Sequence, residues 1–419
     1  MGLTSGLLLW LLITSAAGVI GCTVWLWPRL ARQSVAPITA RLGLIMLAQV
    51  LAIAATLASL NDSLAFFGSW SALLGTGAPA QVATSSSAAS QVARQAAVQP
   101  IQITGSSIGT VFRGGSALPW DRARLASWPA GGPAGRGPRP AGASTAADQG
   151  AVLRVTIRGQ YTGITGSGDY VYLPPQYFQP AYAAARFPVV LAFTGYPNET
   201  INLMKLLTLP AIAARLTAQG RVSPAIYVMV NPSVALPRDT ECTNIPAGLQ
   251  VATYFGRDVP LAVERTFRTQ SGRSGWATIG YSTGAYCAAK LAMLFPAQFS
   301  AAVSLSGYYV ASRDRTTGDL YGGSQAYRNE NNLDCRLRHL PAPPVRILVA
   351  SSDSGEKNLP GTIAFLSLIH PPMRGYSLIL RQGGHNYFTW RRELPQSLEW
   401  LSSELSPARR LVRILPAHG

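Results

Sequence analysis

The chain has 419 residues and a formal net charge of +17, and 32 of its 35 Lys and Arg residues are Arg. A basic balance of this size can indicate a nucleic acid or an anionic lipid as partner. The arginines are scattered along the chain rather than gathered on one helix, so we do not expect nucleic-acid binding. The positive charge is compatible with a loose attraction to acidic envelope polymers or lipid headgroups. The length exceeds one average domain, which predicts a compact domain and further segments.

Two apolar stretches near the N-terminus are long enough to cross a membrane as helices. Residues 5–27 carry no charge, and residues 42–60 form a second candidate span. Three arginines lie between them: Arg29, Arg32 and Arg41. No other Lys or Arg precedes Arg94, so the positive-inside rule predicts a cytoplasmic connecting loop, with both ends of the hairpin outside. A cleaved signal peptide is the alternative for the first span, which the missing basic region before it disfavours.

The composition divides the chain into four parts. We expect a membrane anchor over residues 1–75 and a flexible Ala/Gly/Pro/Arg-rich linker over residues 76–150, because that linker holds too few apolar residues to offset the entropy of ordering. Within the linker, Ile101 is one of the few apolar positions able to dock on neighbouring structure. A compact domain should follow over residues 151–408, and residues 409–419 form a tail.

Strand and helix patterns alternate through the compact domain. Strands are predicted at 152–157, 169–173, 188–193, 225–230, 276–279, 301–306, 345–350 and 377–380. Helices are predicted at 201–218, 251–268, 285–295, 362–369 and 386–405. The first two strands resemble an antiparallel pair, and several later strands are continuous apolar runs typical of a sheet that is buried on both faces. This alternation predicts an α/β fold with a mostly parallel sheet flanked by helices.

One motif lies between a predicted strand and a predicted helix. Gly280-Tyr281-Ser282-Thr283-Gly284 matches the G-x-S-x-G nucleophile elbow, in which the two glycines allow strand and helix to pass closely while the serine hydroxyl is exposed. A bare G-x-S-x-G is common by chance, but this one has the required strand before it and the required helix after it. We therefore predict that Ser282 is a nucleophile.

A serine nucleophile needs a histidine base, and the chain holds only four histidines. His339 precedes a strand, His370 lies on the far side of the next strand, and His418 is in the tail. Only His385 comes directly after the last predicted strand, where a loop at the carboxyl edge of the sheet can bring it over Ser282. We predict that His385 is the general base.

The acid and the oxyanion donors are predicted from chain order. The acid should follow the strand before the histidine, where both Asp353 and Glu356 are candidates. The oxyanion requires two backbone N–H donors. One is the amide of Thr283, directly after the nucleophile; the other should come from the loop after the 188–193 strand, and we assign it to Tyr196.

The remaining reactive side chains suggest no cofactor. There is no H-x-x-x-H, C-x-x-C or P-loop pattern, so we expect neither a metal site nor a nucleotide site. We expect Cys22 and Cys287 to be apolar fillers, and Cys242 to pair with Cys335 if the domain lies outside the cytoplasm. The loop containing Asp239, Glu241 and Cys242 is expected to be solvated at the sheet's carboxyl edge, although it can also border the substrate pocket.

The two motifs around the predicted nucleophile and base resemble the esterase D and antigen 85 branch of the α/β-hydrolases. The first is Gly280–Gly284 with a following helix that ends in Phe-Pro. The second is Gly384-His385-Asn386-Tyr387-Phe388-Thr389-Trp390, which is similar to the antigen 85 pattern of Gly-x-His followed five residues later by Trp. The resemblance covers about residues 152–405 and leaves out both apolar N-terminal stretches.

The resemblance implies an α/β-hydrolase fold and an activity among esterases, S-formylglutathione hydrolases and mycolyltransferases. It favours Glu356 over Asp353, because the acid in that family is often Glu. It also carries over Tyr196 as an oxyanion donor, although Thr194-Gly195 stands here where the family usually has Asp-Gly.

The combined prediction is a membrane-anchored, extracytoplasmic serine esterase that cleaves carboxylic esters. Its substrate is an ester or an acyl lipid, and no cofactor, metal or nucleic acid is expected. One alternative is an acyltransferase that uses the same residues to move acyl chains to envelope sugar or lipid hydroxyls. The other is a non-catalytic envelope binding protein on a hydrolase scaffold. The sequence indicates no oligomeric state.

Overall fold

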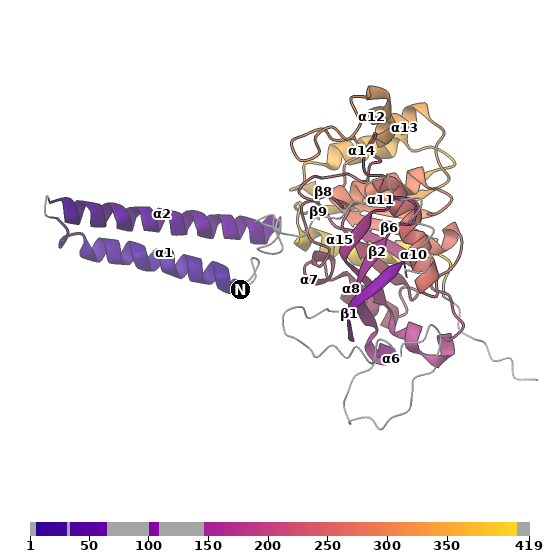
Figure 1. The fold of residues 1–419 in the computed structure, drawn as a ribbon, viewed down its shortest axis with the longest axis horizontal. Helices are drawn as coiled ribbons and strands as arrows, with labels where there is room; N and C mark the ends of the chain where they lie inside the picture. The colour runs from indigo at the N-terminus through magenta and orange to yellow at the C-terminus, as the bar shows by residue number, and fades with distance from the viewer. Residues whose placement is uncertain (1–5, 32–33, 65–99, 109–145, 409–419) are drawn as a thin grey trace, which may run out of the picture. The chain divides into compact units, whose positions relative to one another are not determined.

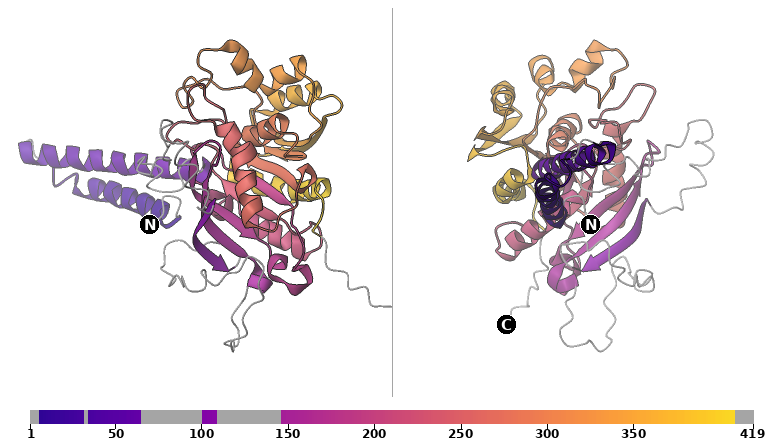
Figure 2. Two further views of the ribbon diagram at one scale, coloured as in Figure 1. Left: turned by 45° about the vertical axis from the view of Figure 1, so that its right-hand side comes forward. Right: turned by 90° about the vertical axis from the view of Figure 1, so that its left-hand side faces the viewer.

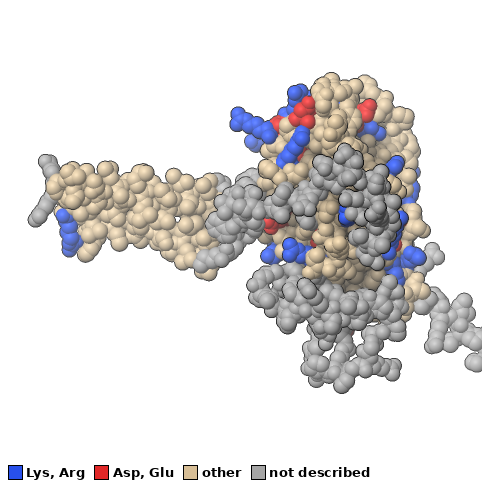
Figure 3. Space-filling view, in the orientation of Figure 1, with Lys and Arg blue, Asp and Glu red and all other residues tan. Residues whose placement is uncertain are grey.

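The structure is a computed structural model that describes residues 6–31, 34–64, 100–108 and 146–408. The chain divides into two compact units, Met1–Gly77 and Ala78–Gly419. The first unit contains α1 (Gly6–Leu26) and α2 (Val35–Leu64). Leu7–Leu26 and Val35–Ser59 within them are long and apolar enough to cross a membrane. On the face that Figure 3 shows, the Lys and Arg side chains of these helices appear at the end where they are joined.

The second unit is built on a nine-stranded sheet in the order β1-β2-β3-β5-β4-β6-β7-β8-β9. The antiparallel part comprises β1 (Ile101–Ile108), β2 (Ala151–Arg158) and β3 (Thr165–Leu173), and β3 is also antiparallel to β5. The parallel part comprises β4 (Val189–Phe193), β5 (Ile226–Val230), β6 (Trp276–Tyr281), β7 (Ala301–Leu305), β8 (Arg346–Ser354) and β9 (Arg374–Gln382). The predicted α/β fold with a mostly parallel sheet is confirmed.

The prediction of a linker over residues 76–150 is wrong for two segments. Residues 101–108 form β1, which pairs with β2 along its length, and residues 146–149 form the short helix α6 (Ala146–Gln149). The docking expected of Ile101 is present, since its side chain is only 4% exposed. The strand extends the sheet because β2 offers it an edge to pair with. The rest of the expected linker and the expected tail lie outside the described residues.

The helices of this unit flank the sheet, as Figures 1 and 2 show. They are α7 (Asn202–Lys205), α8 (Leu209–Ala218), α9 (Val251–Thr253), α10 (Val259–Thr266), α11 (Thr283–Leu294), α12 (Gln325–Asn331), α13 (Leu333–His339), α14 (Leu359–Leu368) and α15 (Tyr387–Glu404). Short 3₁₀ turns lie at Pro175–Phe178, Pro180–Tyr182 and Arg273–Gly275, and a π-helical turn lies at Tyr254–Asp258.

A proline lies where each of two predicted helices departs from a regular α-helix. The expected 201–218 helix breaks between α7 and α8, where Thr208 has a φ of 57° and Pro210 falls in the first turn of α8. The expected 251–268 helix passes through the π-helical turn before α10, whose first turn holds Pro260. Proline has no N–H to donate to the preceding turn, so it fits best in the first turn of a helix.

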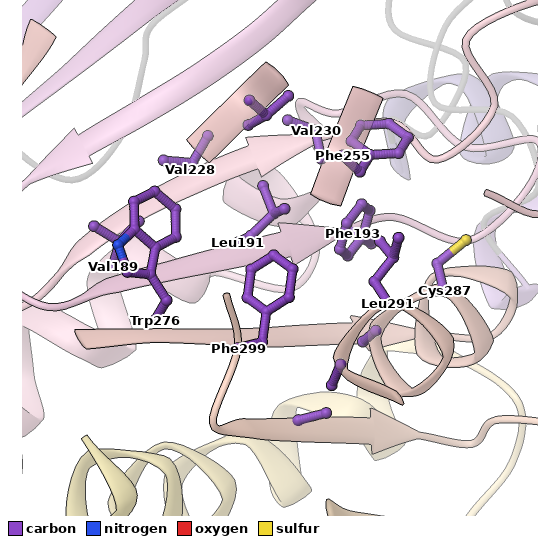
Figure 4. Packing of buried hydrophobic residues seen from close by; sticks show 14 of the residues in the cluster. Val189, Leu191, Phe193, Val228, Val230, Phe255, Trp276, Cys287, Leu291 and Phe299 are labelled. Carbon is purple, nitrogen blue, oxygen red and sulfur yellow. The ribbon is translucent and has the colours of Figure 1, made fainter. Parts of the chain in front are cut away.

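The core lies on both faces of the parallel strands. Alternate residues of β4 and β5 pack against α10 and α11 in one cluster that includes Leu191, Val228 and Leu291 (Figure 4). The residues between them point to the opposite face, since successive side chains of a strand alternate. There Val190 and Tyr227 meet Leu398 of α15. The sheet is thus buried on both faces, which explains the continuous apolar runs in the sequence.

The carboxyl ends of β4, β6, β7, β8 and β9 lie at one edge of the sheet, because these strands are parallel. The predicted site residues lie at this edge: Asp353 is near the end of β8, Thr283 begins α11, and the others are in the connections that follow the strands. Residues 306–345 form a larger insertion between β7 and β8, and α12 and α13 within it were not predicted. Both helices begin at side-chain caps, Ser324 and Asn332, which accept hydrogen bonds from backbone amides.

Candidate active site

Ser282 lies on the sharp turn between β6 and α11. Its φ of 56° and ψ of −125° belong to a region that side-chain-bearing residues rarely adopt, which is the strained geometry of a nucleophile elbow. The Ser282 amide donates a hydrogen bond of 3.1 Å to the carbonyl of Leu305 at the end of β7. The neighbouring strand therefore holds the turn in this conformation.

The glycines around the turn allow a close approach that no side chain would permit. A Cβ atom on Gly280 would lie 2.1 Å from the carbonyl oxygen of Gly284, and one on Gly284 would lie 2.2 Å from that of Thr194. A Cβ on Gly195 would lie 2.9 Å from the Cβ of Ser282. The loop after β4 is consequently packed directly against the nucleophile turn.

His385 is in hydrogen-bond contact with Ser282. Its Nε2 lies 2.9 Å from the Ser282 Oγ, although the two residues are 103 positions apart in the chain. The histidine sits in the loop between β9 and α15, and Asn386 caps α15 by accepting a hydrogen bond of 3.1 Å from the Thr389 amide. The predicted proximity of serine and imidazole is therefore present.

An aromatic cluster holds the two loops together. Tyr281, the residue before the serine, stacks on Trp390 at a centroid distance of 4.4 Å. Trp390 also meets the His385 ring edge to face at 5.2 Å, and the hydroxyls of Tyr281 and Tyr387 are hydrogen-bonded. Because these rings are buried between β6 and α15, they fix the distance between the nucleophile and its base.

The protonation state of His385 suits a general base. The residue as a whole is exposed, but the protein atoms around the ring displace part of its water, and this desolvation lowers the pKa of the imidazole below its usual value of 6.5. The neutral form, which can accept the serine proton, therefore prevails at neutral pH.

The two candidate acids differ in their surroundings. Glu356 is 9% exposed and accepts hydrogen bonds from the hydroxyls of Ser306 and Ser351, whereas Asp353 is exposed. Burial raises the pKa of Glu356, and these hydrogen bonds oppose that rise. Ser306 also accepts a hydrogen bond of 2.7 Å from the Trp390 indole, so Glu356 connects to the cluster beside the imidazole.

Neither carboxylate is hydrogen-bonded to the imidazole within the described part of the chain, where the ring contacts Ser282. Contacts of this kind in ligand-free sites often tighten only when substrate binds. Burial and the link through Ser306 favour Glu356.

The two predicted oxyanion donors lie on either side of Ser282. Thr283 is the first residue of α11, where an amide has no partner within the helix and points toward the helix N-terminus. Tyr196 follows Gly195, the residue packed against Ser282, and its hydroxyl donates a hydrogen bond of 2.6 Å to the carbonyl of Pro237. Both amides therefore belong to segments that border the nucleophile.

The predictions for Cys242, Cys287 and Cys335 are wrong. Cys242 is bonded to Cys287, with a Cα–Cα distance of 5.6 Å, and Cys335 is a free thiol. Cys287 is thus not an apolar filler, because α11 presents it to the loop that carries Cys242. That loop is also not solvated, since Asp239 is 3% exposed and Glu241 is fully buried. A pairing across the fold depends on which segments pack together, and chain spacing does not reveal it.

One further carboxyl group near the site was not noticed in the sequence. Glu393 on α15 is fully buried, and neither of its carboxyl oxygens accepts a hydrogen bond from any described residue. Burial is the main cause that raises the pKa of Glu393, to about 9, and the negative charge of Glu356 adds to the rise. The folded protein therefore keeps Glu393 protonated at neutral pH.

The raised pKa makes Glu393 a source of instability that grows with pH. Unfolded, the group ionises near pH 4.5, so above that pH the unfolded chain releases a proton that the folded protein retains until about pH 9. Glu393→Gln is expected to raise the free energy of unfolding by roughly 3 kcal/mol at pH 7, and by much less at pH 5. Thermal unfolding of the detergent-solubilised chain at both pH values measures this.

The control for this prediction is Glu330→Gln, which removes an exposed carboxylate from α12. It should leave the unfolding temperature nearly unchanged at both pH values. A Glu393→Gln variant that is no more stable than the wild type at pH 8 would contradict the assignment of a neutral, buried Glu393.

Comparisons with known proteins agree with this geometry. Residues 168–401 match the model of the family Esterase, described as "Putative esterase". Among solved structures, a ferulic acid esterase aligns at 17% identity and a TM-score of 0.51, covering 61% of this chain and 98% of its own. An S-formylglutathione hydrolase from Agrobacterium tumefaciens aligns at 15% identity and a TM-score of 0.52, and the alignment covers 61% of this chain and 96% of that one.

At these identities, the likeness to the two solved structures concerns the fold. No curated protein sequence matches the chain. The family match spans more than half of the chain and includes the elbow, both candidate acids and the histidine loop. The chain therefore belongs to the Esterase family and is a serine hydrolase that acts on ester bonds.

Proposed function

We propose that this protein is a membrane-anchored, extracytoplasmic serine esterase that cleaves carboxylic esters through an acyl-enzyme on Ser282. The observation that carries the proposal is the distance of 2.9 Å between the Ser282 Oγ and the His385 Nε2 at a strained strand-to-helix turn. A serine hydroxyl is a weak nucleophile alone, and a neutral imidazole at this distance can remove its proton as it attacks.

In the first half of the reaction, the Ser282 oxygen adds to the ester carbonyl while His385 takes the hydroxyl proton. The carbonyl oxygen becomes an anion, which the amides of Thr283 and Tyr196 stabilise. His385 then returns the proton to the leaving alcohol as the carbon–oxygen bond breaks, and the acyl group stays on Ser282. Glu356 orients the imidazole and stabilises its charged form.

In the second half, water takes the place of the alcohol. His385 removes a proton from the water, which attacks the acyl carbonyl through a second oxyanion, and the serine leaves with the proton that His385 returns. No step requires a metal or a cofactor. Asp353, which is exposed, has no role in this scheme.

The proposed membrane anchor rests on α1 and α2. Both are apolar, most of their side chains are exposed rather than packed in a protein core, and α1 carries no acidic or basic residue. Arg29 and Arg41 lie near the connection between them, and their guanidinium groups lie over the rings of Trp25 and Trp27. Arginine with tryptophan is typical of a membrane interface, and arginine is enriched in cytoplasmic loops. The connection therefore faces the cytoplasm, and the hydrolase domain lies on the outer side.

The test is the pre-steady-state hydrolysis of p-nitrophenyl butyrate by the purified chain in detergent. We expect a burst of nitrophenol equal to the enzyme concentration, followed by slower turnover, and neither in Ser282→Ala. Addition of glycerol or trehalose separates water from another acceptor, because an acyltransferase would yield the acylated sugar or glycerol by mass spectrometry. Turnover that persists in Ser282→Ala would refute the proposal.

A further inference from the structure

One loop contacts both residues whose amides are the proposed oxyanion donors. Residues 236–242 form this loop, which we call the 236–242 loop. The hydroxyl of Tyr196 donates a hydrogen bond of 2.6 Å to the carbonyl of Pro237, and that of Thr283 donates one of 3.2 Å to the Oδ2 of Asp239. The two donors come from different elements, the loop after β4 and the first turn of α11. A single segment therefore connects the two halves of the oxyanion hole.

Asp239 is held rigidly inside the 236–242 loop. It is 3% exposed, and its second carboxyl oxygen accepts hydrogen bonds from the Ser233 hydroxyl at 2.9 Å and the Glu241 amide at 3.1 Å. Its backbone amide also donates a hydrogen bond of 3.0 Å to the carbonyl of Thr316, so contacts inside and outside the loop fix its position toward Thr283.

The end of the loop is in a conformation that needs external support. Glu241 and Cys242 have φ values of 43° and 48°, in the left-handed region that is costly for residues with side chains. Two attachments to α11 hold them there. One is the disulfide from Cys242 to Cys287, and the other is the buried ammonium of Lys290, which donates to the Glu241 carbonyl at 3.1 Å.

Both attachments lead back to the helix that begins at Thr283. Cys287 and Lys290 lie one and two turns along α11 from that residue. The helix, the disulfide and the 236–242 loop thus form a closed frame around the Thr283 hydroxyl. Displacement of a catalytic group by about 1 Å can lower a rate by about 10²-fold, so a frame that fixes both donors bears directly on the rate.

We propose that Asp239 is a positioning residue of the oxyanion hole, and that the Cys242–Cys287 disulfide sustains the rate of ester cleavage by holding Asp239 and Pro237 against the two donors. Neither cysteine is among the residues assigned to the reaction. This inference rests on the proposed function, because it assigns the donors to Tyr196 and Thr283. A disulfide that served stability alone would alter the unfolding temperature without altering the kcat of the folded enzyme.

The experiment compares the full chain in detergent with the double variant Cys242→Ser/Cys287→Ser and with Cys335→Ser, which removes the free thiol on α13. Turnover of p-nitrophenyl butyrate is measured well below each unfolding temperature. We expect the double variant to lose about 10- to 100-fold in kcat with KM within about twofold, since complete removal of one oxyanion donor costs about 10²- to 10³-fold. Cys335→Ser should match the wild type.

A second pair of variants leaves the disulfide intact, in case the double variant does not fold. Asp239→Ala removes the acceptor of the Thr283 hydroxyl and should lower kcat about 10-fold with KM unchanged. Asp239→Asn keeps the shape and a hydrogen-bonding partner for that hydroxyl and should recover most of the activity, which a general loss of folding would not allow.

The outcomes separate this inference from the proposed function. A wild-type chain that turns over no ester would refute both. A wild type that is active, together with a folded double variant and an Asp239→Ala variant whose kcat values stay within about twofold of it, would overturn the inference alone.

Discussion

Replacement of His385 by alanine is expected to lower kcat for ester hydrolysis by about 10⁴- to 10⁶-fold and to leave KM nearly unchanged. The imidazole contacts the nucleophile at 2.9 Å. Among the described residues, the other histidines lie elsewhere: His339 ends α13, and His370 lies just after α14. Loss of the serine or the histidine in such a unit removes almost all of its catalysis. A rate enhancement of about 10³-fold over the reaction in water remains, and it comes from the oxyanion donors.

The matched control is His339→Ala, which removes an exposed imidazole at the end of α13. Its kcat should equal that of the wild type. Steady-state kinetics on p-nitrophenyl butyrate, with circular dichroism to verify folding, give the comparison. A folded His385→Ala variant that keeps a tenth of the wild-type kcat would rule out His385 as the general base.

Glu356→Gln is expected to have the second largest effect, a loss of about 10³- to 10⁴-fold in kcat. An amide keeps the shape of the side chain but cannot stabilise the imidazolium that forms during attack, and it can favour the wrong tautomer of the histidine. Asp353→Asn makes the same chemical change three residues earlier, on an exposed side chain, and should alter kcat by less than about twofold.

The two amide variants distinguish the candidate acids directly. The reverse order of effects, with Asp353→Asn inactive and Glu356→Gln active, would transfer the role to Asp353. Equal and small effects would mean that the histidine works without a carboxylate partner. The kcat of each folded variant at a pH above the pKa of His385 is the deciding quantity.

Much of the fold follows from local sequence patterns. The parallel strands are continuous apolar runs because the sheet is covered on both faces, and this property appears directly in the sequence. Ser282 was found because its glycines, its strand and its helix occur together in one short stretch. His385 is predictable because few histidines compete for the role and only one comes directly after the last strand.

The remaining features depend on contacts between distant segments. The Cys242–Cys287 bond requires the loop after β5 to lie beside α11, which no spacing indicates. The stacking of Tyr281 on Trp390 likewise arises only when α15 packs back on the sheet. β1 was missed because its strand lies in a segment whose overall composition suggests a linker, and its stability comes from the edge that β2 provides.

The distinction between Asp353 and Glu356 also required the structure. Both carboxylates follow the predicted 345–350 strand, although β8 extends through Asp353 in the structure. Only the packing of Ser306 and Trp390 reveals that Glu356 is buried beside the histidine loop while Asp353 faces water. Chain order can identify the loop that supplies an acid, but burial decides which of its residues is used.

Mass spectrometric mapping of the covalent adduct with a fluorophosphonate tests the identity of the nucleophile most directly. The reagent phosphonylates a serine that an adjacent base has activated, so it reports the chemistry without a known substrate. We expect one adduct per folded chain, on the peptide that contains Ser282, and none in Ser282→Ala. An adduct on a different residue, or an unmodified Ser282 in folded protein that hydrolyses esters, would contradict an acyl-enzyme at this position.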